Sequence, residues 1–285
     1  MKKINPFLGL IPAIVILSQP ELANSLGFTA AKSESAQIQE FIISSTKAFN
    51  YDNYAVVLNS YVDRNGLVNY KGLQANRQGL DTFNAGLSSL NPSTYESWNE
   101  KEKIAFWINA YNALTLQSII DQNPLKNSIR DIPGVWKRRT FNIAGQAKTL
   151  DNIEHNTLRV NFNEPRIHVA LVCAAMSCPP LRKEPYTANK LDAQLDNQVR
   201  KFIASPHGFR IDKNQGRVYL SSIFKWYGKD WKQSYGVEGK FTGSANERAV
   251  LNFLSNYLSA EARNYLIQGA YKISYLDYDW SLNKQ

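Results

Sequence analysis

The stretch "KIAFWINAYNALTLQSII", residues 103–120, decides the fold because it reads as a helix with large apolar residues on every side. Charged residues come just before it and Pro124 follows it, so the helix is predicted from Asn99 to Ile120. At about 100° per residue, its apolar side chains point in all directions. Such a helix is buried all round. We therefore expect a central helix enclosed by the rest of a globular domain.

Two side-chain amides lie among the apolar residues of this helix. Asn109 and Asn112 lie one turn apart, on a stripe that also carries Ala105 and Leu116. A buried polar group without a partner costs about 1–3 kcal/mol, so each amide must find hydrogen bonds inside the domain. Both asparagines, together with Trp107 of the same helix, are candidate binding residues.

A second predicted helix, "TLDNIEHNTLR", also carries a polar group inward. On a helical wheel Glu154 falls on the apolar face, His155 lies at its margin and Arg159 lies opposite. A carboxylate on an apolar face is unfavourable unless it is paired or protonated. We expect the two helices to meet, with Glu154 accepting a hydrogen bond from Asn109 or Asn112 and His155 close by.

The stretch "RIHVALVCAAMSCPPL", residues 166–181, reads as a buried strand that ends in a turn. In a strand, His168 would share its face with two alanines, and Cys173 would lie in line with large aliphatic residues. Cys178 falls in the turn before two prolines. His168 has room to make a hydrogen bond and is a further candidate binding residue.

The two cysteines allow three interpretations. A disulfide between Cys173 and Cys178 would contribute about 2 kcal/mol by closing a short loop, and exported proteins form such bonds. Alternatively, both thiols are free and structural. In the third interpretation Cys178 is a catalytic thiolate, with His155 or His168 as its base. A strand would end about 20 Å from His168, which favours His155. The spacing does not suit a zinc site, and neither a metal nor another cofactor is expected.

The N-terminus reads as a targeting segment. Lys2 and Lys3 precede the short apolar run "PFLGLIPAIVIL", which is typical of a secretory signal. Residues 1–23 are predicted to be a signal peptide with an uncertain cleavage site, and an uncleaved anchor is the alternative. Residues 24–50 are predicted to form a helical lead-in. The protein is then exported to the periplasm or the extracellular space.

The charge balance limits the partners. The chain of 285 residues has a formal net charge of +9 at pH 7, but its basic residues are scattered and no nucleic-acid motif accompanies them. Outside the membrane, an anionic envelope polymer or an envelope protein suits this charge better than nucleic acid does. No stable membrane span is expected after removal of the signal.

The remaining segments indicate one mixed domain over residues 51–285. Hairpins are predicted around Asn65-Gly66 and in "FRIDKNQGRVYL", and amphipathic helices alternate with them. No linker separates two cores. The predicted fold class is α+β, a single mixed domain with a buried central helix packed on a small antiparallel or mixed sheet and surrounded by helices.

Several of these motifs together resemble one family. "KIAFWINAYNALTLQSII", "TLDNIEHNTLR", "SSIFKWYGKDW" and "YLDYDWSLN" occur in order, and the chain is similar to the domain of unknown function 547 (DUF547) family from about residue 54 to residue 283. The resemblance implies no established activity. The family's motifs fall on Trp107, Asn109, Asn112, Glu154 and His155, together with Arg159, which is a further candidate binding residue.

A weaker resemblance links the sequence to papain-like and transglutaminase-like enzymes. Those enzymes also have a buried helix followed by strands that bear a histidine. Their nucleophilic cysteine lies at the start of the buried helix, whereas this helix has no cysteine. A likeness at the level of fold does not establish activity.

Two hypotheses of function follow. In the first, the protein is a binding module of the cell envelope, and the buried Asn/Glu/His cluster fixes the structure. In the alternative, it is an envelope hydrolase or acyl-transferase. Glu154 and His155 would then act as acid and base, Asn109 and Asn112 would stabilise charge, and Cys178 would be a nucleophile. No complete catalytic set can be assembled from the sequence, which favours the binding module.

Overall fold

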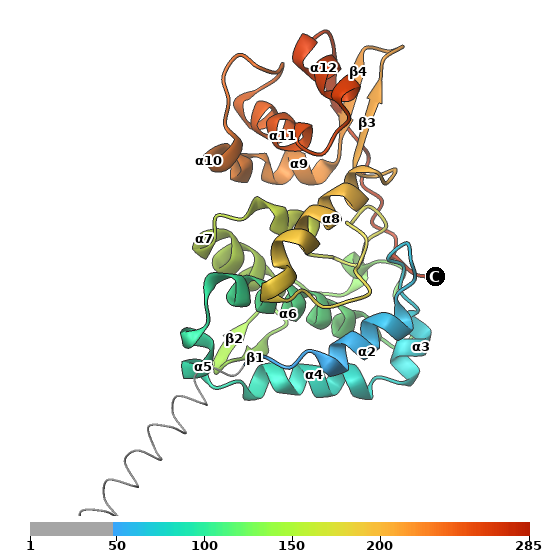
Figure 1. The fold of residues 1–285 in the computed structure, drawn as a ribbon. Helices are drawn as coiled ribbons and strands as arrows, with labels where there is room; N and C mark the ends of the chain where they lie inside the picture. Colours follow the sequence, from blue (N-terminus) through green and yellow to red (C-terminus); the bar gives the residue numbers. More distant parts are fainter. Residues whose placement is uncertain (1–47) are drawn as a thin grey trace, which may run out of the picture. The chain divides into compact units, whose positions relative to one another are not determined.

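The computed structural model describes residues 48–285 (Figure 1). The predicted signal peptide, and the predicted lead-in helix up to residue 47, lie outside the described residues. The elements follow in this order: α2 (Asp52–Tyr61), α3 (Tyr70–Ala75), α4 (Gln78–Ser89), α5 (Pro92–Ser97), α6 (Glu100–Ile120), η1 (Ile129–Asp131), β1 (Phe141–Ile143), β2 (Gln146–Lys148), η2 (Asn152–Leu158), α7 (Arg159–Asn161), η3 (Pro165–Val169), η4 (Ala188–Lys190), α8 (Leu191–Ile203), β3 (Phe209–Asp212), β4 (Arg217–Leu220), α9 (Ser222–Tyr227), η5 (Gly228–Trp231), α10 (Lys232–Tyr235), α11 (Ala245–Ser255), α12 (Ala260–Gln268) and β5 (Lys272–Tyr275).

Helix α6 is the buried central helix that the sequence predicts. It begins after Asn99, whose side chain and that of Glu102 form a capping box, and this pairing satisfies backbone donors that the first turn leaves free. Every residue from Ile104 to Leu116 is buried. Helices α3 and α4 and the short helices η2 and η4 pack around α6. Within residues 48–285 no helix is long and apolar enough to cross a membrane.

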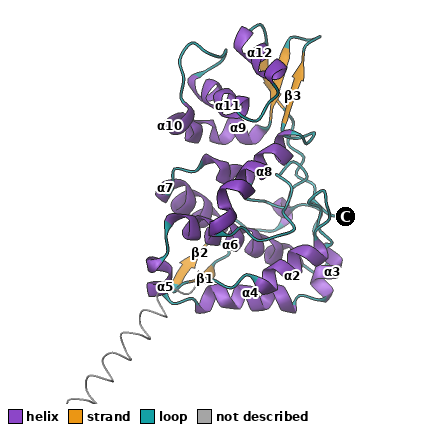
Figure 2. Cartoon of the chain, in the orientation of Figure 1, coloured by secondary structure: helices purple, strands orange, loops and turns teal. Residues whose placement is uncertain are grey.

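Within residues 48–285 the strands form two small sheets (Figure 2). Strands β1 and β2 make an antiparallel hairpin. In the other sheet β3 pairs antiparallel with β4, and β5 pairs parallel with β4. The predicted α+β class is confirmed, and the three-stranded sheet is mixed. The apolar core of the described part of the chain has two clusters, one around α6 and one that joins the three-stranded sheet to α11, and Tyr278 packs against both.

The helix predicted for "TLDNIEHNTLR" is a π-helix over most of its length. The backbone N–H of Arg159 donates to the carbonyl of Glu154, five residues earlier, so the hydrogen bond spans one residue more than in an α-helix. Such turns are rare and occur often at functional sites. The buried residues of η2 are Ile153, Glu154, Thr157 and Leu158, so the inward position predicted for Glu154 is confirmed.

The buried strand predicted within residues 166–181 is wrong. Residues Pro165–Val169 form the 3-10 helix η3, and the chain then runs irregularly. Two local features start η3: Pro165 fixes the backbone at the first position, and the Glu164 side chain accepts from the N–H of Arg166. The strand geometry that separated His168 from Cys178 therefore does not apply.

Candidate functional site

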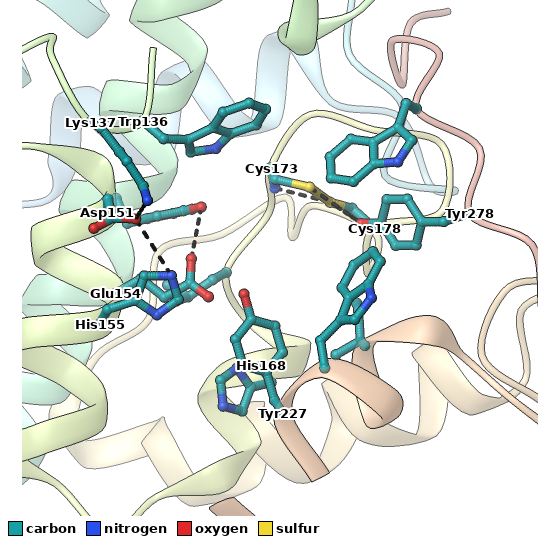
Figure 3. A pocket seen from close by; sticks show the side chains of 15 residues that line it. Trp136, Lys137, Asp151, Glu154, His155, His168, Cys173, Cys178, Tyr227 and Tyr278 are labelled. Atoms are coloured by element: carbon teal, nitrogen blue, oxygen red, sulfur yellow. Dashed lines mark hydrogen bonds and ion pairs between the residues drawn. A yellow bond between two sulfur atoms is a disulfide. The ribbon is translucent and has the colours of Figure 1, made fainter. Parts of the chain in front are cut away.

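A cavity of about 420 Å³ lies where η2, α6, α9 and the C-terminal segment, residues 276–285, come together. Figure 3 shows its labelled side chains turned towards a common space. Five predicted site residues line it: Glu154, His155, His168, Cys173 and Cys178. The full lining is Tyr111, Trp136, Lys137, Asp151, Glu154, His155, His168, Leu171, Cys173, Cys178, Ile223, Trp226, Tyr227, Tyr278 and Trp280.

Glu154 is the buried carboxylate of this cavity, with 9% of its surface exposed. The hydroxyl of Tyr111, on α6, donates to Oε2 of Glu154 at 3.2 Å, and Tyr227 lines the cavity beside the same carboxylate. Burial, reinforced by the Glu154 charge, raises the pKa of Tyr111 and of Tyr227 well above the ordinary tyrosine value. Both hydroxyls therefore keep their protons, and that of Tyr111 holds the carboxylate in place.

The expected contact between Glu154 and the amides of α6 is wrong. Asn109 donates to the carbonyl of Tyr186 at 2.8 Å and accepts from its N–H at 2.9 Å. Asn112 donates to the carbonyl of Ala170 at 3.0 Å and accepts from a backbone N–H, at 2.8 Å, two residues further on. Irregular backbone that crosses α6 has free N–H and C=O groups, and one carboxamide satisfies one of each. Neither asparagine lines the cavity.

Trp107 is also placed outside the cavity. Its side chain is buried in the core around α6, and its indole N–H donates to the hydroxyl of Tyr95 at 2.9 Å. The predicted binding residues Trp107, Asn109 and Asn112 thus hold core and loops together in this structure.

Arg159, predicted opposite Glu154, lies beside the cavity and forms a charged network. Its guanidinium makes two hydrogen bonds to Asp230, at 2.6 and 3.0 Å. His168 donates from Nε2 to the same carboxylate at 2.8 Å and stacks on Tyr227 with 4.1 Å between ring centroids. Burial would raise the pKa of Asp230, but the hydrogen bonds from His168 and Arg159 hold it below the ordinary value. Burial lowers the pKa of His168, so its ring is neutral at neutral pH.

The tautomer of His155 follows from its neighbours. Nδ1 of His155 lies 2.9 Å from NH1 of Arg159, and a guanidinium can only donate, so Nδ1 accepts. In the neutral ring the proton is then on Nε2, which lies 3.7 Å from Oδ1 of Asp151. Lys137 approaches the same oxygen at 3.9 Å. His155 is therefore held by Arg159 on one side and faces an acidic group on the other.

Cys173 and Cys178 form the predicted disulfide, with 6.2 Å between their Cα atoms. The interpretation of Cys178 as a nucleophile does not fit this structure, because a bonded sulfur provides no thiolate. The hydroxyl of Tyr278 lies 3.3 and 3.2 Å from the two sulfurs. The disulfide is thus part of the cavity wall.

The aromatic walls of the cavity were not found by reasoning from the sequence. Tyr278 lies 4.8 Å from Trp226 and 4.6 Å from Trp280, measured between ring centroids, and Trp136 approaches Trp280 at 6.2 Å. Trp226 is 46% exposed. The available signal was the density of aromatic residues in "FKWYGKDW" and "YDW", which come together only after folding.

A pair that resembles a nucleophile and its base lies elsewhere. The Ser177 hydroxyl is 3.1 Å from Nδ1 of His207 and accepts from the backbone N–H of Asp279. Ser177 is only 1% exposed, so a substrate cannot reach it. Ser177 holds the C-terminal segment against the disulfide loop, residues 173–178. Among residues 48–285, no three His, Cys, Asp or Glu residues are placed to hold a metal ion.

Comparison with known proteins supports the family predicted from the motifs. Residues 95–203 match the family described as "Protein of unknown function, DUF547", which confirms the resemblance over this part of the chain. The matched part runs from α5 to α8 and includes Glu154, His155 and the disulfide; the remaining cavity residues from α9 and the C-terminal segment lie outside it. No curated protein and no solved structure matches the chain.

Proposed function

We propose that this protein is a ligand-binding module of the cell envelope, and that the cavity around Glu154 is its ligand site. One observation carries the proposal: a cavity of about 420 Å³ combines a buried carboxylate with tryptophan and tyrosine walls. Ligand sites are concave, mostly apolar and equipped with a few fixed polar groups.

Binding is favoured over catalysis because the cavity lacks an activated nucleophile. The sulfur of Cys178 is bonded to Cys173. The raised pKa of Tyr111 opposes a phenolate nucleophile, as does that of Tyr227. Nδ1 of His155 is occupied by a guanidinium. A nucleophile needs a base within hydrogen-bond reach, and no such pair faces the cavity among the residues that the structure describes.

The predicted compartment belongs to this proposal. The signal-like N-terminus supports export to the periplasm or the extracellular space, and the Cys173–Cys178 disulfide supports an oxidising compartment. The net charge of +9 supports an anionic envelope polymer or an envelope protein as the larger partner. Cell fractionation, with thiol labelling of the intact cells, tests this part.

The ligand site is tested with a low-mass extract of the envelope. Purified protein is incubated with the extract, and bound molecules are detected by native mass spectrometry and by tryptophan fluorescence. We expect a bound mass that is lost in Trp136→Ala and retained in Trp107→Phe, a matched change of a tryptophan outside the cavity. Absence of any bound mass, or equal binding by both variants, contradicts the proposal.

A hydrolase remains the second candidate because Glu154 and His155 do line the same cavity. An acid–base mechanism without a thiol would use this pair. It predicts turnover of the bound molecule, seen as a changed mass over time, and loss of that turnover in Glu154→Gln with the ligand still bound. A ligand recovered unchanged after long incubation argues for the binding module.

A further inference from the structure

The charge of Glu154 has no cationic partner among residues 48–285. None of the ion pairs in this part of the chain includes Glu154. Arg159 interacts electrostatically with Glu154 but forms no ion pair with it. Its guanidinium pairs with both oxygens of Asp230, and Arg159 lines a neighbouring cavity. Tyrosine hydroxyls stabilise a carboxylate but do not neutralise it. A buried charge without a counter-ion is strongly unfavourable.

The charges of the lining leave a negative excess. Lys137 and Asp151 approach each other at 3.9 Å and offset one another. Burial keeps His168 neutral. Nδ1 of His155 accepts from the guanidinium of Arg159 and so carries no proton. Glu154 then contributes the one uncompensated charge of the lining. The cavity is thus suited to a ligand that brings one positive charge.

The walls select the kind of cation. Aromatic rings carry negative charge on their faces and attract ammonium groups, most strongly when the rings are those of tryptophan. The lining holds three tryptophans and three tyrosines, and four of these rings form one contiguous cluster. A compact, strongly hydrated cation gains little from such walls, whereas a substituted ammonium with methyl groups contacts them directly.

We propose that the cavity binds the substituted ammonium group of a ligand, with the cation against Glu154 and its methyl groups against the tryptophan rings. This inference rests on the proposed function and names the ligand class of the same site. The volume of about 420 Å³ exceeds that of an ammonium head alone, so the head belongs to a larger envelope molecule whose remaining part extends towards the cavity mouth, where Trp226 is exposed.

The test uses choline and its neutral isostere 3,3-dimethylbutan-1-ol, which have the same shape and differ in charge. Binding to the wild-type protein is measured by calorimetry and by tryptophan fluorescence. We expect choline to bind at least about tenfold more tightly than the isostere, a difference of about 1.4 kcal/mol. Equal binding of the two probes, or no binding of choline at any soluble concentration, overturns the inference.

Variants locate the site. Glu154→Gln should weaken choline binding at least about tenfold and leave binding of the isostere unchanged. Glu247→Gln is the matched control, because Glu247 also accepts from a tyrosine hydroxyl, that of Tyr275 at 2.9 Å, in the other core cluster. Trp226→Leu keeps an apolar side chain but removes the aromatic ring, so it should weaken the binding of choline more than the binding of the isostere. Choline binding that is equal in Glu154→Gln and Glu247→Gln overturns the inference.

Failure of this inference and failure of the proposed function give different results. Suppose that the wild-type cavity binds an envelope molecule, that Trp136→Ala abolishes this binding, and that choline does not compete with it. The ammonium inference is then wrong and the ligand site stands. If no envelope molecule binds and choline is also without effect, both fall.

Discussion

The amides of α6 and the carboxylate of η2 are both buried polar groups on predicted helices, yet the structure uses them differently. Asn109 and Asn112 are each matched by one N–H and one C=O of a crossing loop. Glu154 accepts from the hydroxyl of Tyr111, forms no ion pair within residues 48–285 and faces a cavity. Burial alone therefore does not mark a functional residue. What separates the two cases is whether the protein itself satisfies both the hydrogen bonds and the charge.

The largest expected effect comes from the structural side of this comparison. Asn112→Ala leaves the carbonyl of Ala170 and the N–H of Val172 buried without partners. We expect a loss of about 2–4 kcal/mol in the free energy of unfolding, since each orphaned group costs about 1–3 kcal/mol. Urea denaturation measures the loss. The control Asn84→Ala removes one side-chain bond to Gln117, and equal stability of the two variants would break the comparison.

The disulfide between Cys173 and Cys178 is a second contact that stabilises the irregular segment bound by Asn112. Replacing both cysteines tests this contribution. The double change Cys173→Ser, Cys178→Ser should lower the free energy of unfolding by about 2 kcal/mol, because the unfolded chain loses a closed loop. The native protein should react with iodoacetamide only after reduction, since both sulfurs are bonded. The reduced wild type serves as the control and should match the double variant. Labelling of native, unreduced protein would contradict the disulfide.

Acid should weaken the network beside the cavity through His168. Burial lowers the pKa of His168 from 6.5 in the folded state. Below pH 6.5 the unfolded chain therefore binds a proton that the folded protein excludes, and stability falls as the pH falls. The slope contributed by one such group is at most about 1.4 kcal/mol per pH unit.

Urea denaturation between pH 7.5 and pH 5 compares wild type with His168→Gln. The variant lacks the titrating ring, so its stability should depend less on pH over this range, whatever its absolute value. Asp230, whose folded pKa is also lowered, contributes with the same sign below about pH 4. Parallel pH profiles for wild type and variant would remove His168 from this account.

The smallest expected effect on stability is that of Glu154→Gln. The glutamine carbonyl can accept from Tyr111 as the carboxylate does, and only the uncompensated charge is lost. We expect the free energy of unfolding to change by less than about 1 kcal/mol, or to rise. Thermal and urea denaturation check this beside the binding measurements. A loss as large as that of Asn112→Ala would mean that Glu154 is structural.

Local pattern was sufficient to predict the central helix. Residues Asn99 and Glu102 mark its start, and apolar residues on all sides predict its burial. The inward position of Glu154 also followed from spacing. The disulfide was one of three alternatives, because two nearby cysteines suit several chemistries. The pairing of Glu154 with Tyr111 could have been anticipated, since a tyrosine on a fully buried helix needs a partner for its hydroxyl.

The rest depended on contacts that no local pattern contains. Residues 166–173 have the apolar run of a strand, but no strand of the described residues pairs with them. Their backbone instead makes local turn bonds, such as that from the N–H of Ala170 to the carbonyl of Ile167, and two bonds to Asn112. The π-helical turn of η2 has no periodic signature in a segment of seven residues. The cavity walls combine residues more than a hundred positions apart, so the ligand site could not be assembled from one motif.

Tyr278 and Trp280 are the last residues, in chain order, that line the cavity. Both belong to the segment that follows β5, far from Glu154 in the sequence. The cavity therefore has its complete aromatic wall only when this segment is docked on the rest of the domain. Ligand binding depends in this way on the packing of residues that follow all the other lining residues in the chain.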